Sequence, residues 1–150
     1  MATDHEHMMR IALEEAARGG AEGNSAVGSV VVDGDQVVAR GRNLVNSTSD
    51  PTAHAETVAL RNAGEALKRT DFSGMTLYTT FEPCPMCCGA ILASGIGTLV
   101  MGARHEPAQS RWGGYKVESL IALTNSAAQL TVITGILTRE CADIRRLETS

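Results

Sequence analysis

Two cysteines and two prolines form the motif Pro83-Cys84-Pro85-Met86-Cys87. Cysteines three positions apart on a helix lie on the same face and can hold one metal ion. With Cys84 near the N-cap and Pro85 at the first helical position, proline costs no hydrogen bond, and both sulfurs lie at the positive end of the helix dipole. That setting favours the thiolate that binds metal. Alone, the pair is compatible with zinc, a redox dithiol or two buried thiols.

A second motif, Thr52-Ala53-His54-Ala55-Glu56, precedes the cysteines by room for one helix and one strand. Such a connection returns the chain to the same edge of a parallel pairing. Residues i and i+2 do not share a face of a regular helix, so His54 and Glu56 must lie at its irregular start. There His54 can bind the metal while Glu56 reaches over it, which leaves the fourth tetrahedral position for water. Three protein ligands and one open position are typical of catalytic zinc.

The segments that must position these residues alternate between strands and helices. Helical spacing with a stop at Gly19-Gly20 predicts a first helix, and β-branched runs on either side of Asp33-Gly34-Asp35 predict a hairpin. After residue 102 a helix, a strand and a helix follow less clearly. The alternation predicts an α/β layer fold with helices on both faces of the sheet. The expected elements are helices over 5–18, 53–67 and 83–93, strands over 26–32, 36–44, 75–80 and 98–102, and a polar loop over 47–52.

Length and charge limit the function classes. The 150 residues, 43% of them hydrophobic, fit one domain with one ordinary core. There are 13 Lys and Arg against 17 Asp and Glu, a net charge of -4, so no overall field draws the molecule toward phosphate. We interpret the basic residues near the C-terminus as a solvated helix face rather than a binding surface; they are Arg139, Arg145 and Arg146.

The four cysteines, at 84, 87, 88 and 141, are three together and one distant, which is typical of a metal site rather than a disulfide framework. Cys88 points away from its neighbour on the helix, so we interpret it as a packed thiol. Residues 1–7 contain no basic and apolar leader, and no stretch approaches the roughly 20 apolar residues that a membrane span needs. We therefore expect a cytoplasmic protein without a membrane segment.

Taken together, His54-Ala55-Glu56 and Pro83-Cys84-Pro85-Met86-Cys87 resemble the signature of the cytidine deaminase superfamily of zinc enzymes. The similarity lies in the branch that contains guanine and cytosine deaminases and bacterial tRNA adenosine deaminases. It implies a three-layer α/β/α sandwich with a mixed five-stranded sheet, with residues 1–150 as a single zinc-dependent deaminase domain that commonly forms a homodimer. It extends through residues 50–56, 77–84, 89–91 and 102–104.

The resemblance implies one Zn²⁺ per subunit, with His54, Cys84 and Cys87 as ligands and Glu56 as the proton shuttle. Zinc lowers the pKa of a bound water from about 15.7 to about 7, so hydroxide is present at neutral pH and can attack the ring carbon that bears the amino group. Glu56 would take the water's proton, pass it to a ring nitrogen and then protonate the departing ammonia.

Three further residues are expected to contact the substrate. Asn43 follows the second expected strand, where similar enzymes place an asparagine that binds the base or its sugar, and an amide can both donate and accept. The backbone at Ala55 is expected to meet the base. Trp112 lies in a glycine-containing loop, Ser110-Arg111-Trp112-Gly113-Gly114-Tyr115, which could lay the indole ring over a base or pack against the domain.

The substrate signals point in two directions. Residues 50–56 and Gly102-Ala103-Arg104 are similar to bacterial tRNA adenosine deaminases, whereas Thr79-Thr80 with the cysteine motif resembles guanine and cytosine deaminases. The acidic charge, and His105-Glu106-Pro107-Ala108-Gln109 where tRNA enzymes carry lysine, threonine and small residues, favour a free base or small nucleoside over tRNA. The first alternative is a tRNA-specific adenosine deaminase that makes inosine. The remote alternatives are a structural zinc module, in which Cys88 or another group completes four protein ligands, and a dithiol oxidoreductase.

Overall fold

The sheet has five strands, and the computed structural model describes residues 4–147. The strand order is β2-β1-β3-β4-β5, in which β1 is antiparallel to both of its neighbours and β3, β4 and β5 are parallel. The expected mixed five-stranded sheet is therefore confirmed. The strands are β1 (Gly28–Asp33), β2 (Gln36–Arg42), β3 (Thr76–Phe81), β4 (Thr98–Ala103) and β5 (Thr131–Ile133).

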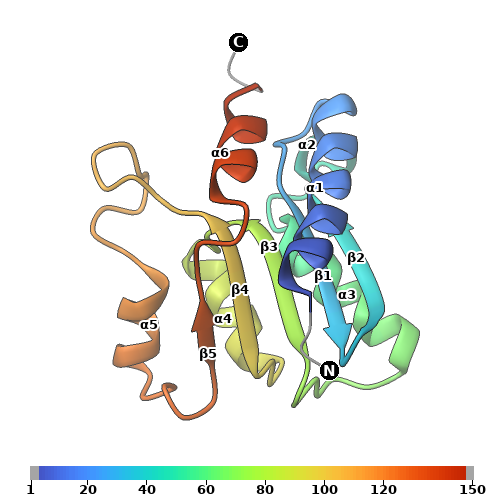
Figure 1. The fold of residues 1–150 in the computed structure, drawn as a ribbon, viewed down its shortest axis with the longest axis vertical. Helices are drawn as coiled ribbons and strands as arrows, with labels where there is room; N and C mark the ends of the chain where they lie inside the picture. The colour runs from blue at the N-terminus through green and yellow to red at the C-terminus, as the bar shows by residue number, and fades with distance from the viewer. Residues whose placement is uncertain (1–3, 148–150) are drawn as a thin grey trace.

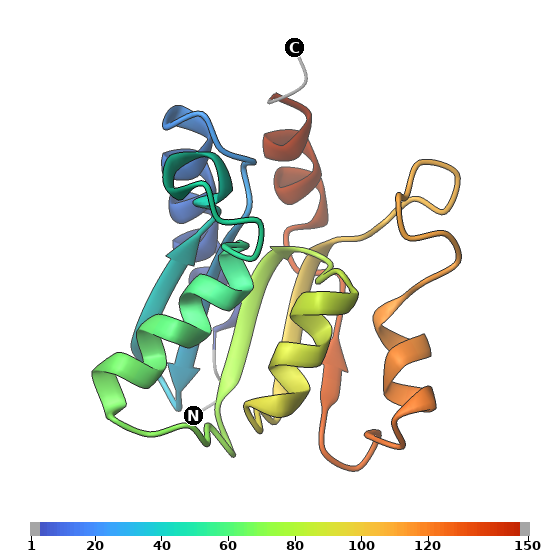
Figure 2. The same cartoon turned by 180° about the vertical axis from the view of Figure 1, so that it is seen from behind.

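Helices cover both faces of the sheet, which gives the three-layer α/β/α arrangement that the resemblance implies (Figures 1 and 2). Helices α1 and α6 pack on the face seen in Figure 1, and α3, α4 and α5 pack on the opposite face. Each face of the sheet has its own hydrophobic core, and strand β1 contributes to both. Val30 and Val32 pack in the core under α1 and α6, and Val31 packs in the core under α3, α4 and α5. The helices are α1 (His5–Ala21), α2 (Val45–Thr48), α3 (Ala55–Leu67), α4 (Pro85–Ala93), α5 (Val117–Leu123) and α6 (Thr138–Leu147).

Two local expectations are wrong. Helix α1 does not stop at Gly19-Gly20 but continues to Ala21, because the end of the helix packs closely on the chain that follows it. A Cβ on Gly19 would lie 3.3 Å from the Ser25 carbonyl oxygen. The polar loop expected over 47–52 begins inside a short helix, α2, which ends in the left-handed residue Ser49.

The sheet topology brings the two chemical motifs to one edge. Because β1 is antiparallel to both β2 and β3, strands β2 and β3 point in the same direction. Helix α4 begins directly after the end of β3, and α3 begins beside the end of β2, so the first turns of both helices lie at the same edge of the sheet (Figure 2). In α/β sheets that edge is where ligands bind. None of the helices within residues 4–147 is long and apolar enough to cross a bilayer.

Gly41 sets the position of helix α3 on the sheet. A Cβ at this position would lie 2.4 Å from the backbone nitrogen of Ala59 and 2.5 Å from the carbonyl oxygen of Ala55. We therefore expect Gly41→Ala to lower the free energy of unfolding by about 3 kcal/mol, because rigid helix backbone must move. The matched control is Gly89→Ala in α4, where the added Cβ meets nothing within 4 Å. Urea unfolding should show the control unchanged or up to about 1 kcal/mol more stable; equal losses in both variants would contradict this packing.

Candidate active site

Three side chains from two helix starts converge at the edge described above. His54 is the N-cap of α3, Cys84 is the N-cap of α4, and Cys87 lies one turn into α4 after Pro85 at the first position. The Nδ1 atom of His54 lies 3.6 Å from Sγ of Cys84 and 3.5 Å from Sγ of Cys87. The ligand atoms of all three lie within 4.8 Å of one another.

These separations fit a tetrahedral zinc ion. Zinc–sulfur bonds of about 2.3 Å and zinc–nitrogen bonds of about 2.0–2.1 Å at tetrahedral angles place the nitrogen and sulfur atoms about 3.6 Å apart. Both nitrogen–sulfur distances in the structure match that value. Two thiols and one imidazole are also the donor types that zinc prefers.

The electrostatics of the three groups favour a metal. The hydrogen bond from Cys87 lowers the pKa of Cys84 to about 4, although burial opposes this, and His54 contributes a second hydrogen bond. The same thiol pairing, together with burial, raises the pKa of Cys87. The hydrogen bond to Cys84 raises the pKa of His54. The cluster thus holds a thiolate that a cation can bind.

Glu56 is the second residue of α3, and only 4% of its surface is exposed. Burial raises the pKa of its carboxyl to about 7, although a hydrogen bond to its own backbone and one with Thr79 oppose the shift. It is absent from the group of three ligands, so its carboxyl can take part in proton transfer instead. This is the arrangement that the His54 and Glu56 spacing predicts.

A cavity of about 230 Å³ opens over the cluster. The three residues expected to contact substrate, Asn43, Ala55 and Trp112, all line it, and their roles stay predictions. The loops that end β2, β3 and β4 supply most of its wall, because these strands end at the same edge. The other lining residues are Ser25, Val27, His54, Glu56, Phe81, Glu82, Cys84, His105, Arg111 and Arg145.

Within residues 4–147, the cluster of His54, Cys84 and Cys87 is the only group of three or more His, Cys, Asp or Glu residues arranged to hold a metal ion. Cys88 is fully buried in the core that α3, α4 and α5 cover, as expected for a packed thiol. The structural zinc module that needs Cys88 as a fourth ligand therefore has no support. An open coordination position beside Glu56 is what a catalytic site requires.

The sequence profile of the cytidine and deoxycytidylate deaminase zinc-binding region matches residues 2–103. The chain belongs to this family. Family membership and the cluster geometry together make the protein a zinc-dependent deaminase, a hydrolase of C–N bonds, in which His54, Cys84 and Cys87 are positioned to hold one metal ion.

Among its relatives, the tRNA-specific adenosine deaminase of Haemophilus influenzae is 40% identical over 138 residues, 91% of this chain and 78% of that protein. The chloroplastic tRNA(adenine(34)) deaminase of Arabidopsis thaliana is 46% identical over 104 residues, which are 69% of this chain and only 8% of the much longer plant protein.

Two solved structures represent both substrate groups. A structure from work on A-to-I editing by tRNA:A34 deaminases shares 35% identity, with a TM-score of 0.80, and covers 92% of this chain and 98% of its own. The guanine deaminase from Nitrosomonas europaea shares 28% identity, with a TM-score of 0.85, and covers 100% of this chain and 87% of its own. The fold is thus common to both, and sequence identity separates them.

The tRNA adenosine deaminases among the relatives contradict our expectation of a free base or small nucleoside as the substrate. The curated relatives, at 34–46% identity, are tRNA adenosine deaminases, so guanine or cytosine as substrate is the wrong reading of this deaminase, and placing tRNA second was also wrong. The error came from the Thr79-Thr80 and cysteine-motif similarity, which reports the shared chemistry, and from the net charge, which does not describe the local surface around the cavity.

That local surface is basic. A second hollow of about 650 Å³ adjoins the cavity, and three unburied arginines, Arg111, Arg145 and Arg146, line it with one acidic residue, Glu106. Two arginines of the lining have acidic partners: Arg104 pairs with Glu82 and Glu118, and Arg146 lies 3.9 Å from Asp143. Arg145 and Arg146, which we interpreted as part of a solvated helix face, thus lie at the rim of this hollow, whereas Arg139 is not among its lining residues.

Aromatic rings hold two of these arginines beside the cavity. The guanidinium of Arg145 lies 4.3 Å from the centre of the Phe81 ring, and that of Arg111 lies 4.6 Å from the centre of the Trp112 ring. Sequence spacing shows α6 as amphipathic but not which surface of the molecule its basic side faces.

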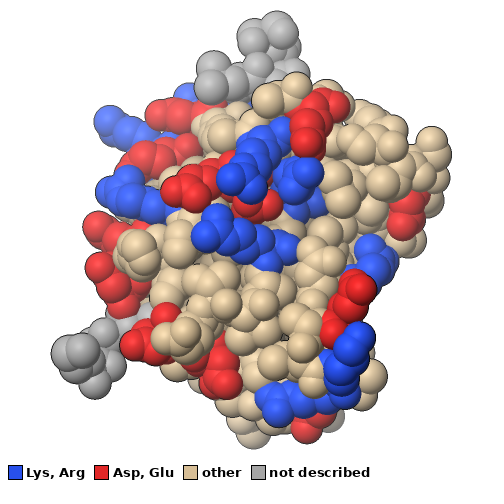
Figure 3. Space-filling view, turned by 90° about the vertical axis from the view of Figure 1, so that its right-hand side faces the viewer, with Lys and Arg blue, Asp and Glu red and all other residues tan. Residues whose placement is uncertain are grey.

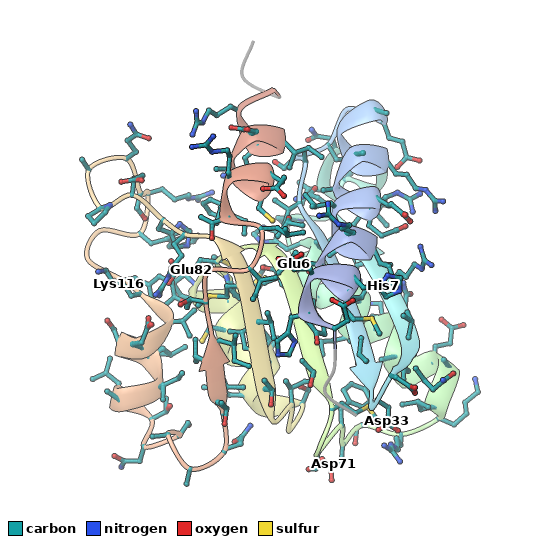
Figure 4. All side chains as sticks on the ribbon, viewed as in Figure 1. Glu6, His7, Asp33, Asp71, Glu82 and Lys116 are labelled. Carbon is teal, nitrogen blue, oxygen red and sulfur yellow. The ribbon has the colours of Figure 1, made fainter. Side chains whose placement is uncertain are left out.

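Glu82 organises the wall of the deaminase cavity, a role that no pattern in the sequence indicates. Only 2% of its surface is exposed, and its two oxygens accept hydrogen bonds from the backbone nitrogens of His105 (3.0 Å) and Val117 (2.9 Å). Arg104 donates two more, from Nε (3.2 Å) and Nη2 (2.9 Å), and also pairs with Glu118. Figure 4 shows Glu82 beside the segment that leads to Lys116. The carboxylate therefore ties the loop after β4 and the start of α5 to the end of β3.

Glu82→Gln should lower the free energy of unfolding by about 3 kcal/mol at pH 7, because Arg104 loses its buried charge partner. Burial alone would raise the pKa of Glu82, but the bonds from Arg104, Val117 and His105 outweigh it and leave that pKa below its usual value. The carboxylate therefore contributes stability above the ordinary glutamate pKa of about 4.3 and loses it as pH falls through the lower folded-state value. Urea unfolding between pH 7 and pH 3 should show the gap narrowing; a constant gap would contradict the ionic role.

Proposed function

We propose that this deaminase converts adenosine to inosine in tRNA, at the first anticodon position. The supporting observation is that relatives spanning most of the chain, among them the Haemophilus influenzae protein, are tRNA-specific adenosine deaminases. We also propose that residues 1–150 act as one catalytic domain and that the active form is a homodimer, as the family resemblance implies.

The proposed chemistry assigns a separate task to each residue of the cavity. His54, Cys84 and Cys87 would hold the zinc, which when bound would lower the pKa of water to about 7 and so supply a nucleophile at neutral pH. Glu56 takes a proton from the attacking water and delivers it to N1 of the adenine ring. The new C6–O bond forms, the C6–N bond breaks, and a proton returned through Glu56 lets the amino group leave as ammonia. The balance is adenosine and water to inosine and ammonia.

Three other side chains or backbone groups hold the base. We assign Asn43 to a hydrogen bond with the base or ribose, the backbone at Ala55 to the base edge, and Trp112 to stacking. The cavity of about 230 Å³ suits one nucleoside, and an enzyme that acts on a base within a strand must turn that base out into such a pocket.

The adjoining hollow would receive the flanking nucleotides. Arg111, Arg145 and Arg146 supply positive charge there, and arginine is suited to phosphate oxygens. The face that contains α1 and β2 differs, because basic and acidic side chains are interspersed there (Figure 3). Arg42 there pairs with Glu22 at 2.7 Å. A net charge of -4 is therefore compatible with RNA binding, because the positive charge that matters is beside the cavity.

The test is a comparison of substrates with zinc-loaded protein. We expect inosine from an anticodon stem-loop with adenosine at position 34, no reaction with the same stem-loop carrying guanosine there, and kcat/KM for free adenosine, guanine and cytosine lower by at least about 10³-fold, because those lose the flanking contacts. Raising the salt concentration should weaken stem-loop binding. Conversion of guanine or cytosine with an untouched adenosine stem-loop would refute the proposal.

A further inference from the structure

Asn24 lies outside the cavity lining but connects two of the cavity's walls. It is 4% exposed and follows α1, where its backbone nitrogen donates to the Gly19 carbonyl oxygen at 2.9 Å. Its neighbour Ser25 lines the cavity. Its side chain contacts helix α2, which begins two positions after the cavity residue Asn43.

Helix α2 has no N-cap side chain of its own, because Leu44 occupies the cap position. The first backbone nitrogens of a helix need acceptors from outside the helix. Oδ1 of Asn24 supplies them from a distant part of the sequence, accepting from the nitrogens of Asn46 (2.9 Å) and Ser47 (3.1 Å). Its Nδ2 donates to Oγ of Ser47 at 2.7 Å. Asn24 therefore caps the second and third nitrogens of α2 from outside the helix.

The first backbone nitrogen of α2, that of Val45, is bonded to Asn43. Oδ1 of Asn43 accepts from the backbone nitrogen of Val45 at 3.0 Å, and the Asn43 backbone nitrogen donates to Val27 at 3.3 Å. Asn43 lines the cavity, and because its amide oxygen is used in this way, its amide nitrogen is the donor that it can offer to a substrate there. This orientation depends on Val45 being held in place, and Asn24 holds the helix to which Val45 belongs.

We propose that Asn24 is a positioning residue for substrate binding: it caps α2 so that Asn43 presents its amide nitrogen to a hydrogen-bond acceptor of the bound nucleoside. The inference rests on the proposed function for its kinetic consequence only. Without the cap, α2 frays, the bond between Val45 and Asn43 weakens, and the Asn43 amide can rotate away. Binding suffers while the chemical groups at Glu56 stay in place.

The kinetic test uses Asn24→Ala, Asn43→Ala and the double variant on the adenosine stem-loop. Asn24→Ala should raise KM about tenfold, the loss expected for one hydrogen bond to a neutral group, and leave kcat within about threefold. Adding Asn24→Ala to Asn43→Ala should change KM no further. Asn24→Asp should restore KM to within about threefold, because its carboxylate accepts from the same two nitrogens and from the Ser47 hydroxyl. Additive effects of the two alanine variants would overturn the proposal.

A second measurement does not need turnover. In NMR spectra, Asn24→Ala should speed amide hydrogen exchange at Asn46 and Ser47 at least about tenfold and shift the side-chain amide signals of Asn43, and Asn24→Asp should restore both. Unchanged exchange and unmoved Asn43 signals would overturn the positioning role. If the wild-type protein converts no adenosine stem-loop, but Asn24→Ala still produces these NMR changes, the proposed function would be refuted and the positioning of Asn43 would remain supported.

Discussion

Replacing Glu56 with alanine should lower kcat for inosine formation by about 10³-fold or more while the protein keeps its zinc. General acid–base catalysis by one side chain contributes about 10²–10⁴-fold to the rate, and in the proposed mechanism Glu56 transfers each proton of the reaction. The metal should remain because Glu56 is not among the three side chains that converge on it. Stopped assays on the adenosine stem-loop and zinc analysis of the same sample measure both quantities.

A matched control is Glu15→Gln, which changes another buried carboxylate, 3% exposed, in helix α1 and outside the cavity lining. Its ion pairs with Arg18 and Arg42 make a loss of stability expected, but kcat should stay within about threefold. If Glu56→Ala retained the activity of the wild type, Glu56 could not be the proton carrier.

The second large effect is expected from the metal ligands. Cys84→Ala should lose both zinc and turnover, because two ligands cannot hold the ion as three can. Metal that binds only the folded chain stabilises it by about 4 kcal/mol at a thousandfold excess over its Kd, so the free energy of unfolding in zinc should fall by about that amount. Metal content and urea unfolding with and without added zinc provide the measurements.

The neighbouring thiol gives the control. Cys88 is buried one residue after a proposed ligand, yet it packs in the core instead of joining the cluster. Cys88→Ala should therefore retain one zinc per chain and most of the activity, with a modest loss of stability from the missing sulfur. Loss of zinc from Cys88→Ala with retention in Cys84→Ala would show that the ligand assignment is wrong.

Much of the local geometry could be predicted because local rules decide it. Pro85 can occupy only the first turn of a helix without cost, which places Cys84 at the N-cap, and the two-residue spacing of His54 and Glu56 excludes a regular helix face. The mixed sheet followed from the family resemblance, since periodicity alone indicated only alternating strands and helices.

Other features depend on contacts between distant segments, which local patterns do not reveal. The cap of α2 comes from Asn24, some twenty positions earlier, and Glu82 accepts from the backbone nitrogens of His105, after β4, and Val117, at the start of α5. Helix α1 extends through Gly19 because of tertiary packing rather than helix propensity. The side chain of Arg145 faces the cavity through its contact with Phe81, which only the folded arrangement shows.

The prediction of a free-base substrate from the sequence was wrong for a related reason. A net charge summed over 150 residues averages the paired charges near Arg42 with the basic hollow beside the cavity, although RNA would contact only the second. The cysteine and histidine motifs are the signature of zinc deaminases and therefore indicate the reaction. The substrate is determined instead by the loops around the cavity, where sequence identity to relatives carries the information.

The most direct test of the account uses zinc-loaded protein and the adenosine-34 stem-loop in water enriched in ¹⁸O. Mass spectrometry of the released nucleosides should show inosine with one solvent oxygen for each adenosine lost and an equal amount of ammonia, and Glu56→Ala should give neither. An untouched stem-loop, or inosine that carries no solvent oxygen, would contradict hydrolytic deamination of tRNA adenosine at this site.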